Sequence, residues 1–186
     1  MMYRITFFLS LIFLVSACGE DETPPEIVPS PVAACCENDA FDASVGGNSI
    51  FIPNVFTPDN DGLNDLFLIM ADSDEVIILD FKVKTAIGTT VFSAQNFPAF
   101  ADAGKWDGTV NGTVTKGIFN YEAEVQAADG SVLLLEGKIC SLPCPPAGET
   151  EPTFAALDNC LFSTQHDGQG GADENLPSFE ELECLE

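Results

Sequence analysis

The stretch FIPNVFTPDNDGLNDLF, residues Phe51–Phe67, indicates the fold of this chain more clearly than any other part of the sequence. Its first half is mostly apolar and ends at a proline, Pro58. The next seven residues, Asp59–Asp65, place three carboxylates and two amides around one glycine. A proline at the end of a strand, followed by Asp, Asn and Gly, is typical of an edge strand that runs into a compact, oxygen-rich turn.

The acidic residues of this turn have the spacing of calcium-binding loops. Asp59, Asp61 and Asp65, together with the backbone carbonyl of Leu63, follow the pattern D-x-D-G-x-x-D. Hard oxygen ligands at alternate positions on a tight turn suit Ca²⁺. The alternative is an Asx turn with exposed carboxylates, because the distal Glu of the full EF-hand pattern is absent. Calcium is the one cofactor that the sequence suggests, and the Asx turn stays open beside it.

Short strands separated by turns extend over residues 50–139. The clearest strand signal is the alternation of apolar and polar side chains over Phe119–Gln126. Asp129–Gly130 then indicates a hairpin turn into Ser131–Ile139. Asp39–Asn48, by contrast, is predicted to be a loop before the first strand. About seven short strands without a helical repeat predict an all-β fold, a β-sandwich.

Three motifs carry a resemblance to a known family. Phe51–Phe67 is followed by Trp106–Gly108, with the sequence WDG, and then by Lys116–Tyr121, with the sequence KGIFNY. Together they resemble the gliding motility-associated C-terminal domain of Bacteroidota, also called the type B sorting domain of the type IX secretion system. The resemblance covers about residues 50–140 and implies an immunoglobulin-like sandwich. Sorting domains of that family normally end their protein, whereas 46 residues follow residue 140 here.

The N-terminus has the features of a bacterial lipoprotein signal in their usual order. Residues 1–17 begin with a basic segment and continue as an apolar run, Ile5–Ala17, which is too short to span a bilayer comfortably. Leu14–Cys18 resembles a lipobox, in which Cys18 carries the lipid. Several acyl chains on Cys18 would anchor the mature protein stably to a membrane. The alternative is an ordinary secretory signal that contains a cysteine.

Residues 18–49 follow as a tether that is rich in proline and acidic residues. The acidic triplet Glu20–Glu22 resembles the surface-export signal of Bacteroidota lipoproteins, and a solvated linker is its alternative. These features predict a lipid-anchored protein of the outer membrane that faces the cell exterior. The formal net charge of −24 at pH 7 excludes nucleic acid as a favourable partner.

Besides Cys18, the chain has six cysteines, and an even number in an exported protein predicts up to three disulfides. They are Cys35, Cys36, Cys140, Cys144, Cys160 and Cys184. Cys140 and Cys144 could suggest a metal site, but a zinc site is disfavoured, because the chain has one histidine and no second motif of the CxxC type. The tail, residues 141–186, holds ten carboxylates and no Lys or Arg, and we expect disulfides to pin it in place. The pairing stays open.

Catalysis finds no support in the sequence. The single histidine, His166, lies in a Gly-rich acidic segment, and no Ser or Cys has an identifiable base in a motif. We therefore predict a non-enzymatic binding module, an accessory subunit of an outer-membrane protein complex whose partners are outer-membrane or cell-surface proteins. On this interpretation the sandwich, residues 50–140, is a sorting-type domain reused in a lipoprotein. One alternative is a free-standing adhesin or gliding lipoprotein, and another is a type IX secretion substrate whose sandwich is a sorting domain.

Overall fold

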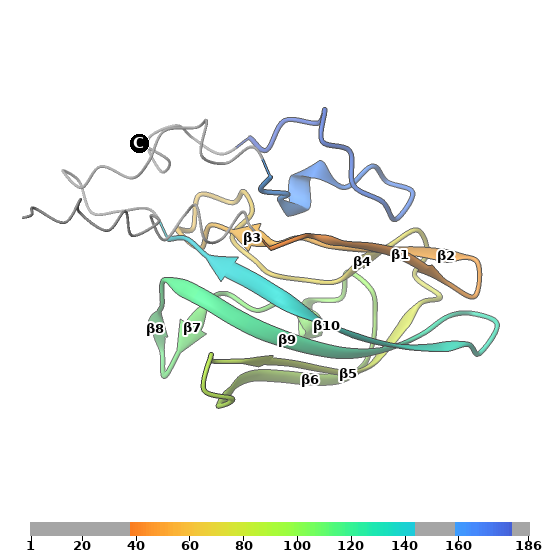
Figure 1. The fold of residues 1–186 in the computed structure, drawn as a ribbon, viewed down its shortest axis with the longest axis horizontal. Coiled ribbons are helices and arrows are strands. Elements are labelled where there is room, and N and C mark those ends of the chain that lie inside the picture. The colour runs from red at the N-terminus through yellow and green to blue at the C-terminus, as the bar shows by residue number, and fades with distance from the viewer. Residues whose placement is uncertain (1–37, 144–158, 180–186) are drawn as a thin grey trace, which may run out of the picture.

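The computed structural model describes residues 38–143 and 159–179 (Figure 1). The predictions for Cys18 and for Cys35, Cys36, Cys144 and Cys184 lie outside these residues. The regular elements, in chain order, are β1 (Phe41–Val45), β2 (Asn48–Ile52), β3 (Val55–Phe56), β4 (Met70–Ala71), β5 (Ile77–Lys84), β6 (Thr90–Pro98), η1 (Asp102–Gly104), β7 (Thr109–Val110), β8 (Thr113–Val114), β9 (Gly117–Gln126), β10 (Val132–Ser141) and η3 (Ser163–Gln165). In the described part of the chain these are strands and short 3₁₀ turns, which confirms the all-β prediction.

The strands form two larger sheets and one small hairpin. The order is β1-β2-β4 in the smaller sheet and β3-β10-β9-β5-β6 in the larger one, and β7 pairs with β8. Neighbouring strands are antiparallel except β3 and β10, which run parallel. Figure 1 shows the smaller sheet lying over the larger one, an arrangement that is consistent with a β-sandwich.

One apolar core lies between the two sheets. Ile50 and Ile52 of β2 enter it from the smaller sheet, and Phe81 and Val83 of β5 enter it from the larger one. All four are completely buried, and each burial stabilises the fold by roughly 1.5–3 kcal/mol. The alternation predicted over β9 is present as well, because every second residue from Phe119 to Val125 is buried. The core therefore positions the loops at the ends of both sheets.

The hairpin predicted at Asp129–Gly130 is confirmed. The turn joins β9 to β10, and Ala127 N–H donates to the Ser131 carbonyl oxygen at 2.9 Å. The prediction of a loop over Asp39–Asn48 is wrong, because Phe41–Val45 form β1 and pair antiparallel with β2. β1 is short and only part of it is apolar, so its alternation is weak in sequence, and the pairing with β2 is what makes it a strand.

The C-terminal segment, residues 159–179, runs along the outer side of β1, β2 and β3 in Figure 1, where it is coloured blue. It contains η3 and one isolated bridge between His166 and Ala172. Among the residues that the structure describes, no helix is long and apolar enough to cross a membrane.

Candidate functional site

The turn after β3 folds around the side chain of Asp65. One of its carboxylate oxygens accepts the backbone N–H groups of Asp59 at 3.0 Å and Asn60 at 2.6 Å. The other oxygen accepts the N–H of Gly62 at 2.8 Å. Backbone hydrogen bonds from Asp and Asn side chains are what favours these residues in tight turns. The sequence thus folds locally as predicted, into a compact turn.

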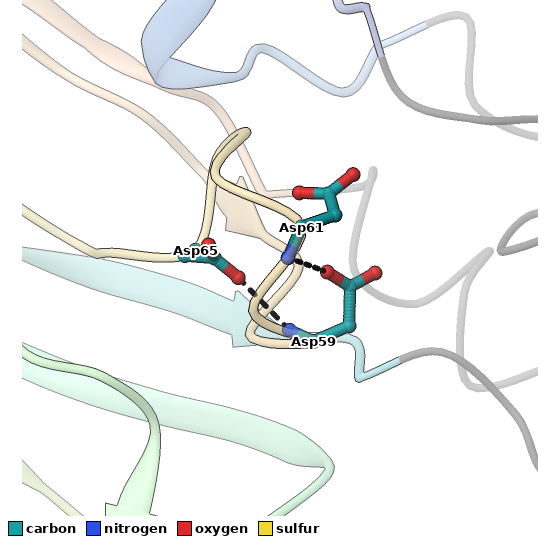
Figure 2. Close-up of side chains that lie close together, drawn as sticks. All are labelled: Asp59, Asp61 and Asp65. Atoms are coloured by element: carbon teal, nitrogen blue, oxygen red, sulfur yellow. Dashed lines mark hydrogen bonds between the residues drawn. The ribbon is translucent and has the colours of Figure 1, made fainter.

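Two further Asx turns complete the loop, and Figure 2 shows the first of them, between Asp59 and Asp61. Asp59 Oδ1 accepts the N–H of Asp61 at 3.0 Å, and Asp61 Oδ1 accepts the N–H of Leu63 at 2.7 Å. As a result, ligand oxygens of Asp59, Asp61 and Asp65 lie within 4.8 Å of one another. The structure therefore brings together the three carboxylates that the sequence singled out, with Leu63 in the same loop.

The pKa of the Asp59 carboxyl differs from its ordinary value, mainly because the group is partly buried. Partial burial raises the pKa of its carboxyl above the usual value, and the charges of Asp61 and Asp65 raise it further, against a backbone hydrogen bond that lowers it. A divalent cation would offset this repulsion, and carboxylate oxygens are the ligands that Ca²⁺ prefers. The geometry is that of a loop able to hold a hard cation. Calcium binding stays a prediction.

The base of the loop is joined to the rest of the sandwich at Trp106. Phe67 and Trp106 exchange two backbone hydrogen bonds, of 2.8 and 2.9 Å. The buried indole packs on Phe56 and Phe119, with ring centroids 5.4 and 4.8 Å away. The three sequence motifs, far apart in the chain, therefore meet around one tryptophan at one end of the sandwich.

Sequence reasoning missed the roles of Asn54 and Asn64. Both side chains are buried, and both bind the backbone of residues 159–178. The partners of Asn54 are 105 and 107 residues further along the chain, and those of Asn64 are 99 to 114 residues further along. No local pattern can mark such contacts, and the only signal was the presence of asparagines in the motif Phe51–Phe67.

The described cysteines, Cys140 and Cys160, are both disulfide-bonded. They are buried together in a small apolar cluster with Val55, Leu142 and Phe162, on the side of the sheet next to β3. This cluster joins the end of β10 to the C-terminal segment. The pairing stays open, since Cys35, Cys36, Cys144 and Cys184 lie outside the described residues.

His166 is packed between two aromatic rings and does not face a Ser or Cys nucleophile in any of the described contacts. Its ring stacks on Phe51, with centroids 6.2 Å apart, and meets the edge of Phe100 at 5.6 Å. Burial lowers its pKa, and the neighbouring carboxylate of Asp167 opposes this shift. The histidine therefore has a packing role in this structure.

Comparison with known proteins gives one family. Residues 50–133 match the family described as the CHU_C Type IX secretion signal domain. The match starts within β2 and ends within β10, so it includes the acidic loop, the tryptophan and both asparagines. A signal domain of this kind is non-catalytic and implies secretion to the cell surface or outer membrane. No curated protein matches the chain.

Proposed function

We propose that this protein is a type IX secretion substrate and that residues 50–133 are its sorting domain. The observation that carries the proposal is the match of these residues to the type IX secretion signal family. The accessory-subunit role that the sequence analysis favoured has no such support, and the match favours what the sequence analysis held as an alternative. The sorting domain is not the end of this chain, because residues 134–186 follow it.

The packing of the motifs supports recognition of a folded domain rather than of a linear tag. Gly108, two residues after Trp106, has a φ of +75°, and a Cβ there would lie 3.0 Å from both Pro58 Cγ and Ser141 Oγ. Glycine is the residue that accepts this backbone conformation and this close approach. The motif residues are thus those that a closely packed end of the sandwich requires.

The finer fold assignment also belongs to this proposal. We infer an immunoglobulin-like sandwich, because the order β3-β10-β9-β5-β6 places a central hairpin, β9–β10, beside β5 and its edge strand β6. The variable-type immunoglobulin sheet is built in the same way from its last two strands and the C and C′ strands. The parallel pairing of β3 with the last strand supports this assignment.

A lipid anchor at Cys18 would give the secreted protein an attachment to the outer membrane. The order of basic start, apolar run and Leu14–Cys18 supports the anchor. The two export routes to the cell surface depend on different parts of the chain. Export as a lipoprotein depends on Cys18, whereas export by the type IX system depends on the sorting domain.

The test is the accessibility of the full chain to an added protease on intact cells of a bacterium that has a type IX system. We expect surface exposure or release to be lost in a strain with an inactive system and to persist in Cys18→Ser. Gly108→Val should reduce secretion, because its side chain would press on Pro58 and Ser141. Gly112→Val is the matched control, because it also has a positive φ, of +81°, but faces open space. Exposure that requires Cys18 and ignores the type IX system would contradict the proposal.

A further inference from the structure

The C-terminal segment, residues 159–179, is bound to the body of the protein through two asparagine side chains. The first is Asn54, which lies between β2 and β3 and is 1% exposed. Its amide Nδ2 donates to the Asn159 carbonyl oxygen at 2.9 Å, and its Oδ1 accepts the N–H of Leu161 at 2.7 Å. Its backbone N–H donates to the Leu161 carbonyl oxygen at 3.2 Å. Asn54 thus binds this part of the segment as a neighbouring strand would.

The second is Asn64, at the end of the acidic turn. Its Oδ1 accepts the hydroxyl of Ser163 at 2.9 Å and the N–H of Thr164 at 3.1 Å. Its Nδ2 donates to the Ser178 carbonyl oxygen at 2.9 Å. Asn64 therefore joins the two ends of the segment to the body.

Most of these contacts are to backbone atoms, so the surface recognises an extended chain more than a particular side-chain sequence. Phe162, between the two sites, has extended dihedral angles, φ −94° and ψ 165°. Gly170 lies so close to β2 that a Cβ would overlap the carbonyl group of Ser49. Extended peptides that bind to the edge of a sheet are held in the same way, by hydrogen bonds to their backbone. A glycine lets the backbone of the bound chain come close to the surface.

The segment is also separate from the main core. The core between the sheets is made of residues of β1, β2, β3, β4, β5, β6, β9 and β10 and their loops. Cys160 and Phe162 belong instead to the small second cluster, where they pack on Val55, Cys140 and Leu142. We propose that the surface formed by Asn54 and Asn64 is a peptide-binding site that reads the backbone of an extended chain. In this protein the site holds residues 159–178 as an intramolecular ligand, and the part that follows the disulfide-bonded Cys160 can open as a unit while the sandwich stays folded.

The first experiment is hydrogen exchange on the full chain, comparing Asn64→Gly with Asn60→Gly. Both asparagines lie in the acidic turn with positive φ, +43° and +70°, so glycine keeps the backbone in both cases. The Asn64 side chain bonds to Ser163, Thr164 and Ser178 of the segment, whereas the Asn60 N–H donates to Asp65 within the turn. We expect Asn64→Gly to accelerate amide exchange at Leu161 and Asp173 by about 10- to 100-fold. These two amides bond to Asn54 and Gln165 and not to residue 64, so faster exchange there would report opening of the segment. Amides of β9 should be unchanged, and Asn60→Gly should have no effect at either place.

Acceleration of β9 together with the segment would overturn the inference, because the segment would then open only with the whole sandwich. Unchanged exchange at Leu161 and Asp173 in Asn64→Gly would overturn it as well, because the asparagine would not hold the segment.

The second experiment tests whether the emptied site accepts the segment from outside. Gly170→Val displaces the segment through its clash with Ser49, and Gly168→Val is the control, since it has a similar φ, +77°, and open space around it. Cys160→Ser is added to both, so that no disulfide holds the segment at this position. A labelled peptide of residues 159–179, with serine at position 160, should bind the Gly170→Val protein saturably. It should not bind the Gly168→Val protein, nor the Gly170→Val protein that also carries Asn64→Gly. Absence of binding to the Gly170→Val protein, with β9 amides still protected, would overturn the peptide site.

Discussion

Asp65 determines the shape of the acidic turn, because its carboxylate accepts three backbone N–H groups of the turn, those of Asp59, Asn60 and Gly62. The carboxylates of Asp59 and Asp61 accept the backbone N–H groups of Asp61 and Leu63, two residues further on. This division of roles follows from positions along the turn, and the spacing in the sequence was sufficient to predict that the three side chains converge. The roles of Asn54 and Asn64 were not predictable, because their partners come from a distant segment.

Calcium should stabilise this turn. At a free Ca²⁺ concentration about 10 to 100 times the dissociation constant, binding adds roughly 1.4–2.7 kcal/mol, and we expect the melting temperature to rise by about 5 °C. Asp61→Ala should abolish the rise, and Asp61→Asn, which keeps an oxygen for the Leu63 N–H, should reduce it. Asp74→Ala, an exposed acidic residue outside the turn, is the control. The measurement is thermal unfolding with and without Ca²⁺, and identical melting curves would count against a calcium site.

At the scale of strands, the sequence predicted those elements whose side chains alternate over many residues. β9 has ten residues with a regular inward face, and its hairpin with β10 has a strong turn signal. β1 has five residues, and its strand character depends on pairing with β2, so local propensity was too weak to find it. The sheet order, with β3 parallel to β10, depends on contacts between residues far apart in the chain and could not be read from alternation.

Gly137 of β10 gives the prediction at this scale. It faces Tyr121 across the β9–β10 pair, and a Cβ on Gly137 would overlap the tyrosine ring. Tyr121 cannot easily move, because it is 3% exposed and packs 5.6 Å from the ring of Phe67, and its burial raises the pKa of its hydroxyl to about 12. We expect Gly137→Ala to lower the free energy of unfolding by about 1–3 kcal/mol in urea denaturation.

The neighbouring exposed residue provides the control for that measurement. Lys138→Ala should change the free energy of unfolding by less than about 0.5 kcal/mol. In a double-mutant cycle, the cost of Gly137→Ala should shrink when Tyr121 is replaced by Ala, since the overlapping ring is then gone. If Gly137→Ala lowered the free energy of unfolding equally with Tyr or Ala at position 121, the strain would not come from the tyrosine ring.

At the scale of the whole molecule, an acidic segment binds an acidic body without using ion pairs. In the described residues the three ion pairs, Lys82–Asp80, Lys84–Glu122 and Lys105–Asp102, all lie within the body. The segment is held instead by neutral hydrogen bonds to Asn54 and Asn64 and by the stacking of His166 on Phe51. These contacts need no lysine or arginine, in a chain that has thirty acidic residues and six basic ones. It also makes the charge state of the one histidine important.

Protonation of His166 should weaken the binding of the segment. Gly168 N–H and Gly170 N–H point at its two ring nitrogens, at 3.3 and 3.2 Å. A neutral imidazole can accept one of these bonds, and an imidazolium can accept neither. Burial lowers the pKa of His166 below 6.5 in the folded protein. The stabilisation is therefore complete above about pH 6.5 and is lost as the pH falls through the folded pKa.

The charged groups near the His166 ring affect how much stability is lost when the ring is protonated. The carboxylate of Asp167 lies beside the imidazole and favours its protonated form. The carboxylate of Asp42 accepts the N–H of Ala172, which pairs with His166. The rings of Phe51 and Phe100, which pack on the imidazole, are uncharged. We expect the urea midpoint to fall more steeply between pH 7 and pH 5 in the wild type than in His166→Phe, which keeps an aromatic ring but cannot titrate. Carboxylates such as Asp59 titrate in both proteins, so their contribution cancels in the difference. Equal slopes in the two proteins would show that the histidine stays neutral or that its charge does not destabilise the fold. The segment would then be held by its other contacts, those to Asn54 and Asn64 and those of Cys160 and Phe162.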